Sequence, residues 1–195
     1  MKNNKGFSLV ELIIVIAIMA ILAAAVAPAL IRYIDKSRRS DDLAMCETVG
    51  KAVLLTINSG DGEDATGVDT DLYQLWCDNS FTNARYSVSV DGGPTYQVEN
   101  VAYWQNGQNG NVFVDGGASE VQPFVDAVNT NVGTPLPKLL KNTKDPANSG
   151  NQIDTIYVMK HVANSEIEVW VGYGGGGTSG HPLYKLYPEP CAAYK

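Results

Sequence analysis

The most uniformly apolar stretch of the sequence is an unbroken run of residues near its N-terminus. From Leu12 to Ile31 the chain reads LIIVIAIMAILAAAVAPALI, without a single charge. As an α-helix, with about 1.5 Å per residue, this run spans the roughly 30 Å hydrocarbon core of a bilayer. It therefore predicts one membrane-spanning helix over about 12–31. A cleaved secretory signal is the alternative, although its apolar run is usually only about 7–15 residues long.

Beyond the span the pattern becomes amphipathic instead of ending. Apolar or small residues recur at alternating steps of three and four, namely Leu43, Cys46, Gly50, Val53 and Ile57. This spacing puts them on one face of a helix, so that face is expected to be covered. Residues 58–62, Asn-Ser-Gly-Asp-Gly, then favour a turn. We expect one long helix over 7–58, with its second half under a globular head of residues 59–195.

The head has the short alternating runs that are typical of β-strands. Strands are expected at Arg85–Val90, Tyr96–Trp104 and Asn111–Val114, and a hairpin pairs Thr155–His161 with Glu166–Tyr173. Short helices are expected at Thr70–Cys77 and Glu120–Asn129. The predicted fold is α+β, with a long N-terminal helix packed on an antiparallel sheet.

Charge and motif content argue against several functions. The formal net charge is −7, which disfavours binding to a nucleic-acid backbone. The glycines at 174–177 are not followed by the Gly-Lys-Ser/Thr of a phosphate loop, and the acidic residues at 61–64 lack EF-hand spacing. His161 and His181 are the two histidines, and no nucleophile or metal motif stands out. We expect no enzyme activity, cofactor or metal, although an anchored enzyme or binding module is kept as an alternative.

A family resemblance lies directly before the apolar run. Residues 5–12 read KGFSLVEL, which resembles the class III leader of type IV pilins and the related pseudopilins of type II secretion. The resemblance implies that a prepilin peptidase removes residues 1–6 by cutting between Gly6 and Phe7. It also implies N-methylation of Phe7 and a role for Glu11 in assembly.

Glu11 has two interpretations that are compatible. Ser8 and Glu11 have the spacing of a helix-starting capping box, with the carboxylate near the positive end of the helix dipole. A carboxylate within a membrane helix also costs about 2.5–3.5 kcal/mol at the helix centre, so it calls for a partner. Cleavage before Phe7 would expose a cationic α-amino group that a neighbouring subunit could offer to Glu11.

The charges that flank the span conflict with this topology. Lys2 and Lys5 precede it, whereas Arg32, Lys36, Arg38 and Arg39 follow it. A simple positive-inside count would place the second group in the cytoplasm. The resemblance instead implies that the leader stays cytoplasmic. Nearby aspartates suggest that the second group is an ion-paired helix surface.

Pro28 and the three cysteines add further expectations. Pro28 removes a helix hydrogen bond, so it predicts a kink or local melting; it is also tolerated in many membrane helices. An exported head permits disulfides, and three thiols leave one unpaired. Cys46 falls on the apolar helix stripe. A disulfide between Cys77 and Cys191 is expected, which would tie down the C-terminus as in many pilins; a zinc site with a histidine is the weaker alternative.

The resemblance implies a structural function. We expect a subunit of an extracellular type IV pilus filament, a homopolymer that supports adhesion, twitching motility, aggregation or DNA uptake. The precursor would be a single-pass protein of the cytoplasmic membrane, with its N-terminus in the cytoplasm. Its partners would be identical subunits, the prepilin peptidase and methylase, and the pilus assembly platform. A pseudopilin of a type II secretion system is the alternative.

Overall fold

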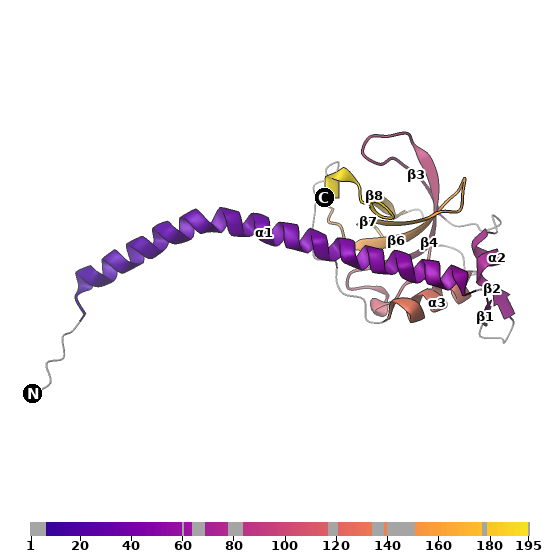
Figure 1. The fold of residues 1–195 in the computed structure, drawn as a ribbon, viewed down its shortest axis with the longest axis horizontal. Coiled ribbons are helices and arrows are strands. Elements are labelled where there is room, and N and C mark those ends of the chain that lie inside the picture. The colour runs from indigo at the N-terminus through magenta and orange to yellow at the C-terminus, as the bar shows by residue number, and fades with distance from the viewer. Residues whose placement is uncertain are drawn as a thin grey trace, which may run out of the picture. The chain divides into compact units, whose positions relative to one another are not determined.

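The fold is described from a computed structural model of the chain (Figure 1). It describes residues 7–59, 61–63, 69–77, 84–116, 121–133, 139, 151–176 and 179–194. The chain divides into two compact units, Met1–Arg38 and Arg39–Lys195. The second unit holds the latter part of the long helix together with the sheet. From here on, the head means this whole unit, residues 39–195, and no longer residues 59–195 alone.

The long helix α1 runs from Leu9 to Asn58, which confirms the predicted helix. In the first unit its apolar side chains are exposed, and α1 contains a segment long and apolar enough to cross a membrane. In the head it buries the predicted stripe, including Cys46, Val49 and Val53. Helix α1 is assigned as continuous through Pro28, and the kink at this residue stays a prediction.

Gly50 of α1 lies against the ring of Tyr187, which leaves no room for a side chain at this position. A Cβ placed on Gly50 would lie 2.5 Å from Cδ1 of Tyr187, well inside van der Waals contact. The absent side chain lets the aromatic ring of Tyr187, at the end of the last strand, lie directly on the helix backbone. The amphipathic spacing predicted burial of Gly50, but the tyrosine that covers it comes from the far end of the sequence.

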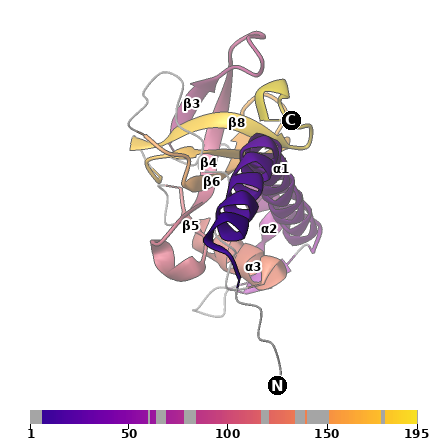
Figure 2. The ribbon, with the colours of Figure 1, turned by 90° about the vertical axis from the view of Figure 1, so that its left-hand side faces the viewer.

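The sheet of the head has six strands, and all of its pairs are antiparallel. Its order is β3-β4-β6-β7-β8, with β5 paired to β4. The bounds are β3 Arg85–Val88, β4 Tyr96–Gln105, β5 Val114–Asp115, β6 Thr155–His161, β7 Ile167–Tyr173 and β8 His181–Tyr187. Figure 2 shows β8 beside the head segment of α1. Two further short strands, β1 Asp61–Glu63 and β2 Asp69–Asp71, form a separate pair.

The remaining helices are short. Those with described bounds are α2 Leu72–Cys77, α3 Gln122–Val132 and the 3-10 helices η1 Asn109–Asn111 and η4 Ala192–Tyr194. The predicted strand Asn111–Val114 is wrong for most of its length. Its first residue belongs to η1, where Gly110 has a φ of 59°, and β5 starts only at Val114. Strand β8 was not predicted.

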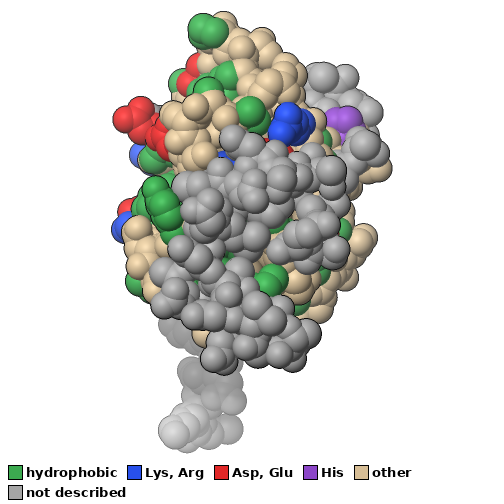
Figure 3. Space-filling model, turned by 90° about the vertical axis from the view of Figure 1, so that its right-hand side faces the viewer, with side chains coloured by type: hydrophobic (Ala, Val, Ile, Leu, Met, Phe, Trp, Pro, Cys, Tyr) green, Lys and Arg blue, Asp and Glu red, His purple; other side chains and the backbone are tan. Residues whose placement is uncertain are grey.

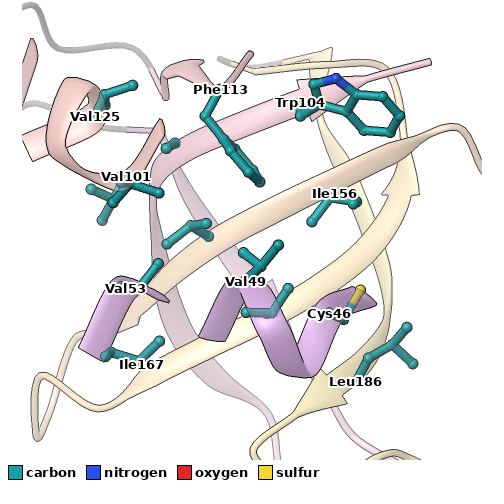
Figure 4. Close-up of a cluster of buried hydrophobic side chains, with 14 of the residues drawn as sticks. Cys46, Val49, Val53, Val101, Trp104, Phe113, Val125, Ile156, Ile167 and Leu186 are labelled. Carbon is teal, nitrogen blue, oxygen red and sulfur yellow. The ribbon is translucent and has the colours of Figure 1, made fainter. Parts of the chain in front are cut away.

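Alternation along the strands divides the hydrophobic side chains between two clusters. The larger cluster joins α1, α3 and one sheet face through residues such as Val49, Val125 and Ile156 (Figure 4). The smaller cluster contains Tyr157, Met159 and Trp170. In the face of the head drawn in Figure 3, hydrophobic side chains reach the surface between polar and charged ones.

Candidate functional site

The first described turn of α1 carries the residues of the predicted assembly site. The backbone N–H of Ser8 donates to Oε2 of Glu11 at 2.9 Å. The N–H of Leu12 donates to the carbonyl of Ser8 at 3.2 Å. Ser8 therefore occupies the N-cap position, and Glu11, three residues later, returns a hydrogen bond to it. This contact confirms the Glu11 half of the predicted capping box.

The carboxylate of Glu11 lies among uncovered apolar side chains. Phe7 is 76% exposed, and Leu9, Val10 and Leu12 are also exposed. Glu11 is the one acidic residue between Phe7 and Ile34. A helix that is apolar on all sides is typically buried in a protein core or in a membrane. The segment therefore requires lipid or other protein chains around it, with a carboxylate near one end.

The structure describes only one of the two residues that flank the predicted cleavage site. Phe7 is the first described residue, whereas Gly6 lies outside the described residues. The Gly6–Phe7 cleavage and the methylation of Phe7 are therefore carried by the sequence alone. They stay predictions that the geometry of the first turn does not test.

Comparison with known proteins identifies a sequence motif in the first segment. The family model described as "Prokaryotic N-terminal methylation motif" matches residues 1–27. The chain carries this methylation motif. Its match covers the leader residues, the Ser8–Glu11 turn and most of the predicted span, which are the residues that carry the resemblance to type IV pilins.

Curated relatives extend the similarity beyond the motif. A fimbrial protein of Dichelobacter nodosus is 36% identical over 99 residues, covering 51% of this chain and 59% of the relative. A fimbrial protein of Moraxella nonliquefaciens is 39% identical over 75 residues, covering 35% of this chain and 49% of the relative. The type IV major fimbrial protein FimA of Dichelobacter nodosus is 42% identical over 68 residues, covering 35% and 41%.

These matches confirm the resemblance to type IV pilins. The chain spans about half the length of the curated relatives that it matches. No solved structure gives a significant match.

The cysteine expectation needs a correction. Cys191 is a buried free thiol, as is Cys46, so the predicted disulfide between Cys77 and Cys191 is not formed in this structure. The side chain of Cys77 lies outside the described part. Cys191 belongs to the main hydrophobic cluster, which accounts for its burial without a covalent partner. Burial, together with the nearby Asp42 charge, raises the pKa of the Cys46 thiol.

Hydrogen bonds hold the C-terminus where a disulfide was expected. The Tyr194 hydroxyl donates to Oδ2 of Asp42 on α1 at 2.8 Å, with both residues buried. The N–H of Ala192 donates to the Asp91 carboxylate at 2.8 and 3.0 Å. Sequence reasoning missed these contacts because Asp42 and Tyr194 are separated by almost the whole head and no local pattern links them.

The two histidines have aromatic neighbours. His161 stacks on Tyr96 and His181 stacks on Tyr173, with ring centroids 4.7 and 4.6 Å apart. The described residues contain no group of three or more metal-ligating side chains. In the acidic stretch 61–71, the backbone of Asp61–Glu63 pairs with that of Asp69–Asp71.

Proposed function

We propose that this protein is a subunit of a type IV pilus filament. In the proposal the precursor is held in the cytoplasmic membrane by α1, and a prepilin peptidase cuts it between Gly6 and Phe7. The new N-terminus is methylated, and an assembly platform passes the subunit into an extracellular homopolymer. The observation that carries the proposal is the methylation motif over residues 1–27, followed by a helix whose apolar side chains are uncovered.

The apolar side chains of α1 would have different surroundings before and after assembly. Lipid covers the apolar side chains of the first unit before assembly, and the same side chains of other subunits cover them in the filament. Because both surroundings are apolar, transfer between them does not expose this surface to water. The same helix thus serves as a membrane anchor and as a polymerisation surface.

Glu11 would set the register between subunits. Within the isolated chain its Oε2 accepts the Ser8 N–H, which leaves further lone pairs on the carboxylate. In a filament, the cationic α-amino group of Phe7 from a neighbouring copy would add an ion pair in a water-poor core. A charge pair of this kind is strong only when both groups are close and desolvated. Misregistered subunits would leave both charges unpaired.

The test replaces Glu11 with alanine and compares it with Glu47→Ala. Glu47 lies on the same helix, is exposed and pairs with Lys51 at the surface at 2.6 Å. We expect Glu11→Ala to be membrane-inserted and trimmed but absent from filaments beside wild-type subunits. Glu47→Ala should enter filaments normally. Normal incorporation of Glu11→Ala would refute the assembly role of this carboxylate.

A further inference from the structure

An open groove of about 560 Å³ lies in the head at the C-terminal end of α1. Its walls come from the last turns of α1, from α2, from the β6–β7 turn and from the end of β8. Leu54, Tyr73, Trp76, Tyr187 and Pro188 give it an apolar and aromatic lining, and Glu166 contributes a carboxylate. The groove is thus formed by segments far apart in the sequence.

A hydrogen bond joins two walls of the groove, and some of the apolar side chains that line it are exposed to solvent. The indole N–H of Trp76 donates to the carbonyl of Ser165 at 2.7 Å, which joins α2 to the β6–β7 turn. Tyr73 is 56% exposed and Leu54 is 40% exposed. The neighbouring Leu55 is 58% exposed. Several large apolar side chains therefore border one groove, and an exposed patch of this kind typically marks an interaction site.

The charge of the groove favours a cationic occupant. Glu166 is the only charged side chain among the described residues that line it. Glu189, directly after the lining residue Pro188, is exposed as well. Residues 39–195 as a whole contain 9 Lys and Arg against 19 Asp and Glu, a formal net charge of −10.

The chain carries a segment of complementary chemistry on α1. Arg32 and Lys36 are exposed and lie four residues apart, so they share one helix face. Tyr33, beside them, is 72% exposed. This segment directly follows the apolar run. It therefore combines an exposed aromatic ring with two cations, which match the apolar lining and the carboxylate of the groove.

We propose that the groove binds the Arg32–Lys36 segment of α1 from a second copy of this chain. The inference rests on the proposed filament and names one contact within it. Tyr33 packs on the apolar lining, and Arg32 or Lys36 pairs with Glu166. The middle of this segment and the groove residues of α1 are 22 positions apart in the sequence, about 33 Å along a helix. Copies with parallel helices would be offset by roughly this distance.

This offset separates the groove contact from the Glu11 contact. Phe7 and Glu11 are four residues apart, about one helical turn. A copy whose α-amino group reaches Glu11 is therefore offset by much less than 33 Å. The groove must receive a different neighbour, so the two contacts can be lost independently.

The experiment reverses the charges one at a time and together. We expect Glu166→Lys and Lys36→Glu each to lower the yield of sheared filaments several-fold, and the double variant to restore most of it. Asp126→Lys, an exposed acid on α3 that does not line the groove, is the control and should assemble normally. Precursor levels in the membrane should be equal in all variants.

A cross-linking experiment gives a second measure in assembled filaments. Glu166→Cys combined with Lys36→Cys should yield covalent ladders of subunits with a bifunctional thiol reagent, whereas Asp126→Cys with Lys36→Cys should not. Normal yield from Glu166→Lys together with absent ladders would overturn the groove contact and leave the filament proposal standing. Absence of filaments from the wild-type chain would overturn both.

Discussion

Tyr194, the penultimate residue, donates its hydroxyl proton to Asp42 of α1 at 2.8 Å inside the head. The two residues are 2% and 1% exposed. Tyr194 also lies against the ring of Tyr184 on β8, with centroids 5.6 Å apart. This hydrogen bond links η4 to α1, the helix that also carries the candidate membrane span. It therefore fixes η4 to the same helix that is proposed to polymerise.

The first prediction concerns this link. Tyr194→Phe keeps the ring but removes the proton donor from a buried carboxylate. Hydrogen bonds to charged groups contribute about 1.5–3 kcal/mol, so the free energy of unfolding should fall by roughly that amount. Chemical denaturation of the full chain in detergent measures it. Tyr33→Phe, at an exposed position, should leave the value unchanged, and equal stability of the two variants would contradict the account.

The second prediction is a loss of stability at alkaline pH. Burial, with the Asp42 charge and hydrogen bond, raises the pKa of Tyr194 above its ordinary value of 10.0. Burial likewise raises the pKa of Tyr86 to about 12. Above pH 10 the unfolded chain releases these protons while the folded chain retains them, so stability is full below pH 10 and falls as the pH rises.

Tyr194→Phe provides the control for this pH dependence. The variant lacks the Tyr194 hydroxyl, whose pKa is raised in the folded chain. Its free energy of unfolding should therefore fall less between pH 9 and pH 11 than that of the wild type. Parallel denaturation curves at several pH values measure the difference. Identical slopes for the two proteins would show that Tyr194 does not contribute to alkaline unfolding.

The third prediction concerns Gly50. Alanine in place of glycine within a helix normally stabilises it by about 1 kcal/mol. Here a Cβ would meet the Tyr187 ring at 2.5 Å. Overpacking costs about 1–3 kcal/mol, so Gly50→Ala should destabilise the head. Adding Tyr187→Leu should relieve part of this loss. A thermal melt of each variant shows whether Gly50→Ala lowers the melting temperature, as expected here, or raises it.

The fourth prediction concerns a buried ion pair in the sheet. Lys160 Nζ lies 3.3 Å from Glu99 Oε2, and each side chain is 1% exposed. Lys160 also donates to the carbonyl of Trp76 at 3.2 Å. Glu99→Gln removes one buried carboxylate charge from beside the Lys160 ammonium group, and breaking a buried ion pair costs up to about 3–5 kcal/mol. Arg85→Gln, which removes a half-exposed partner of Glu99, should cost less than about 1 kcal/mol.

Features set by local spacing could be predicted from the sequence. The β6–β7 hairpin was predicted to within one residue, because both arms are rich in β-branched and aromatic residues around a short polar turn. The Ser8–Glu11 contact followed from a three-residue spacing. Both depend on neighbours along the chain, so no knowledge of distant contacts was needed.

Features set by distant contacts could not be predicted. Strand β8 contains Pro182, which argues against a central strand, yet β8 lies at the end of the sheet order, where proline is tolerated. Tyr187 covers Gly50, and Tyr194 reaches Asp42, across most of the head. Neither partner carries a local signal. A disulfide at Cys191 was expected to hold the C-terminal residues in place. In this structure, hydrogen bonds and hydrophobic packing hold them instead.

The most direct test of the central claim is the intact mass and N-terminal analysis of protein sheared from the cell surface. The account predicts filaments built from a chain that begins at N-methylated Phe7 and lacks residues 1–6. A surface chain that still carries Met1, or one that is cut near Ala27 as a secretory signal would be, would contradict the account.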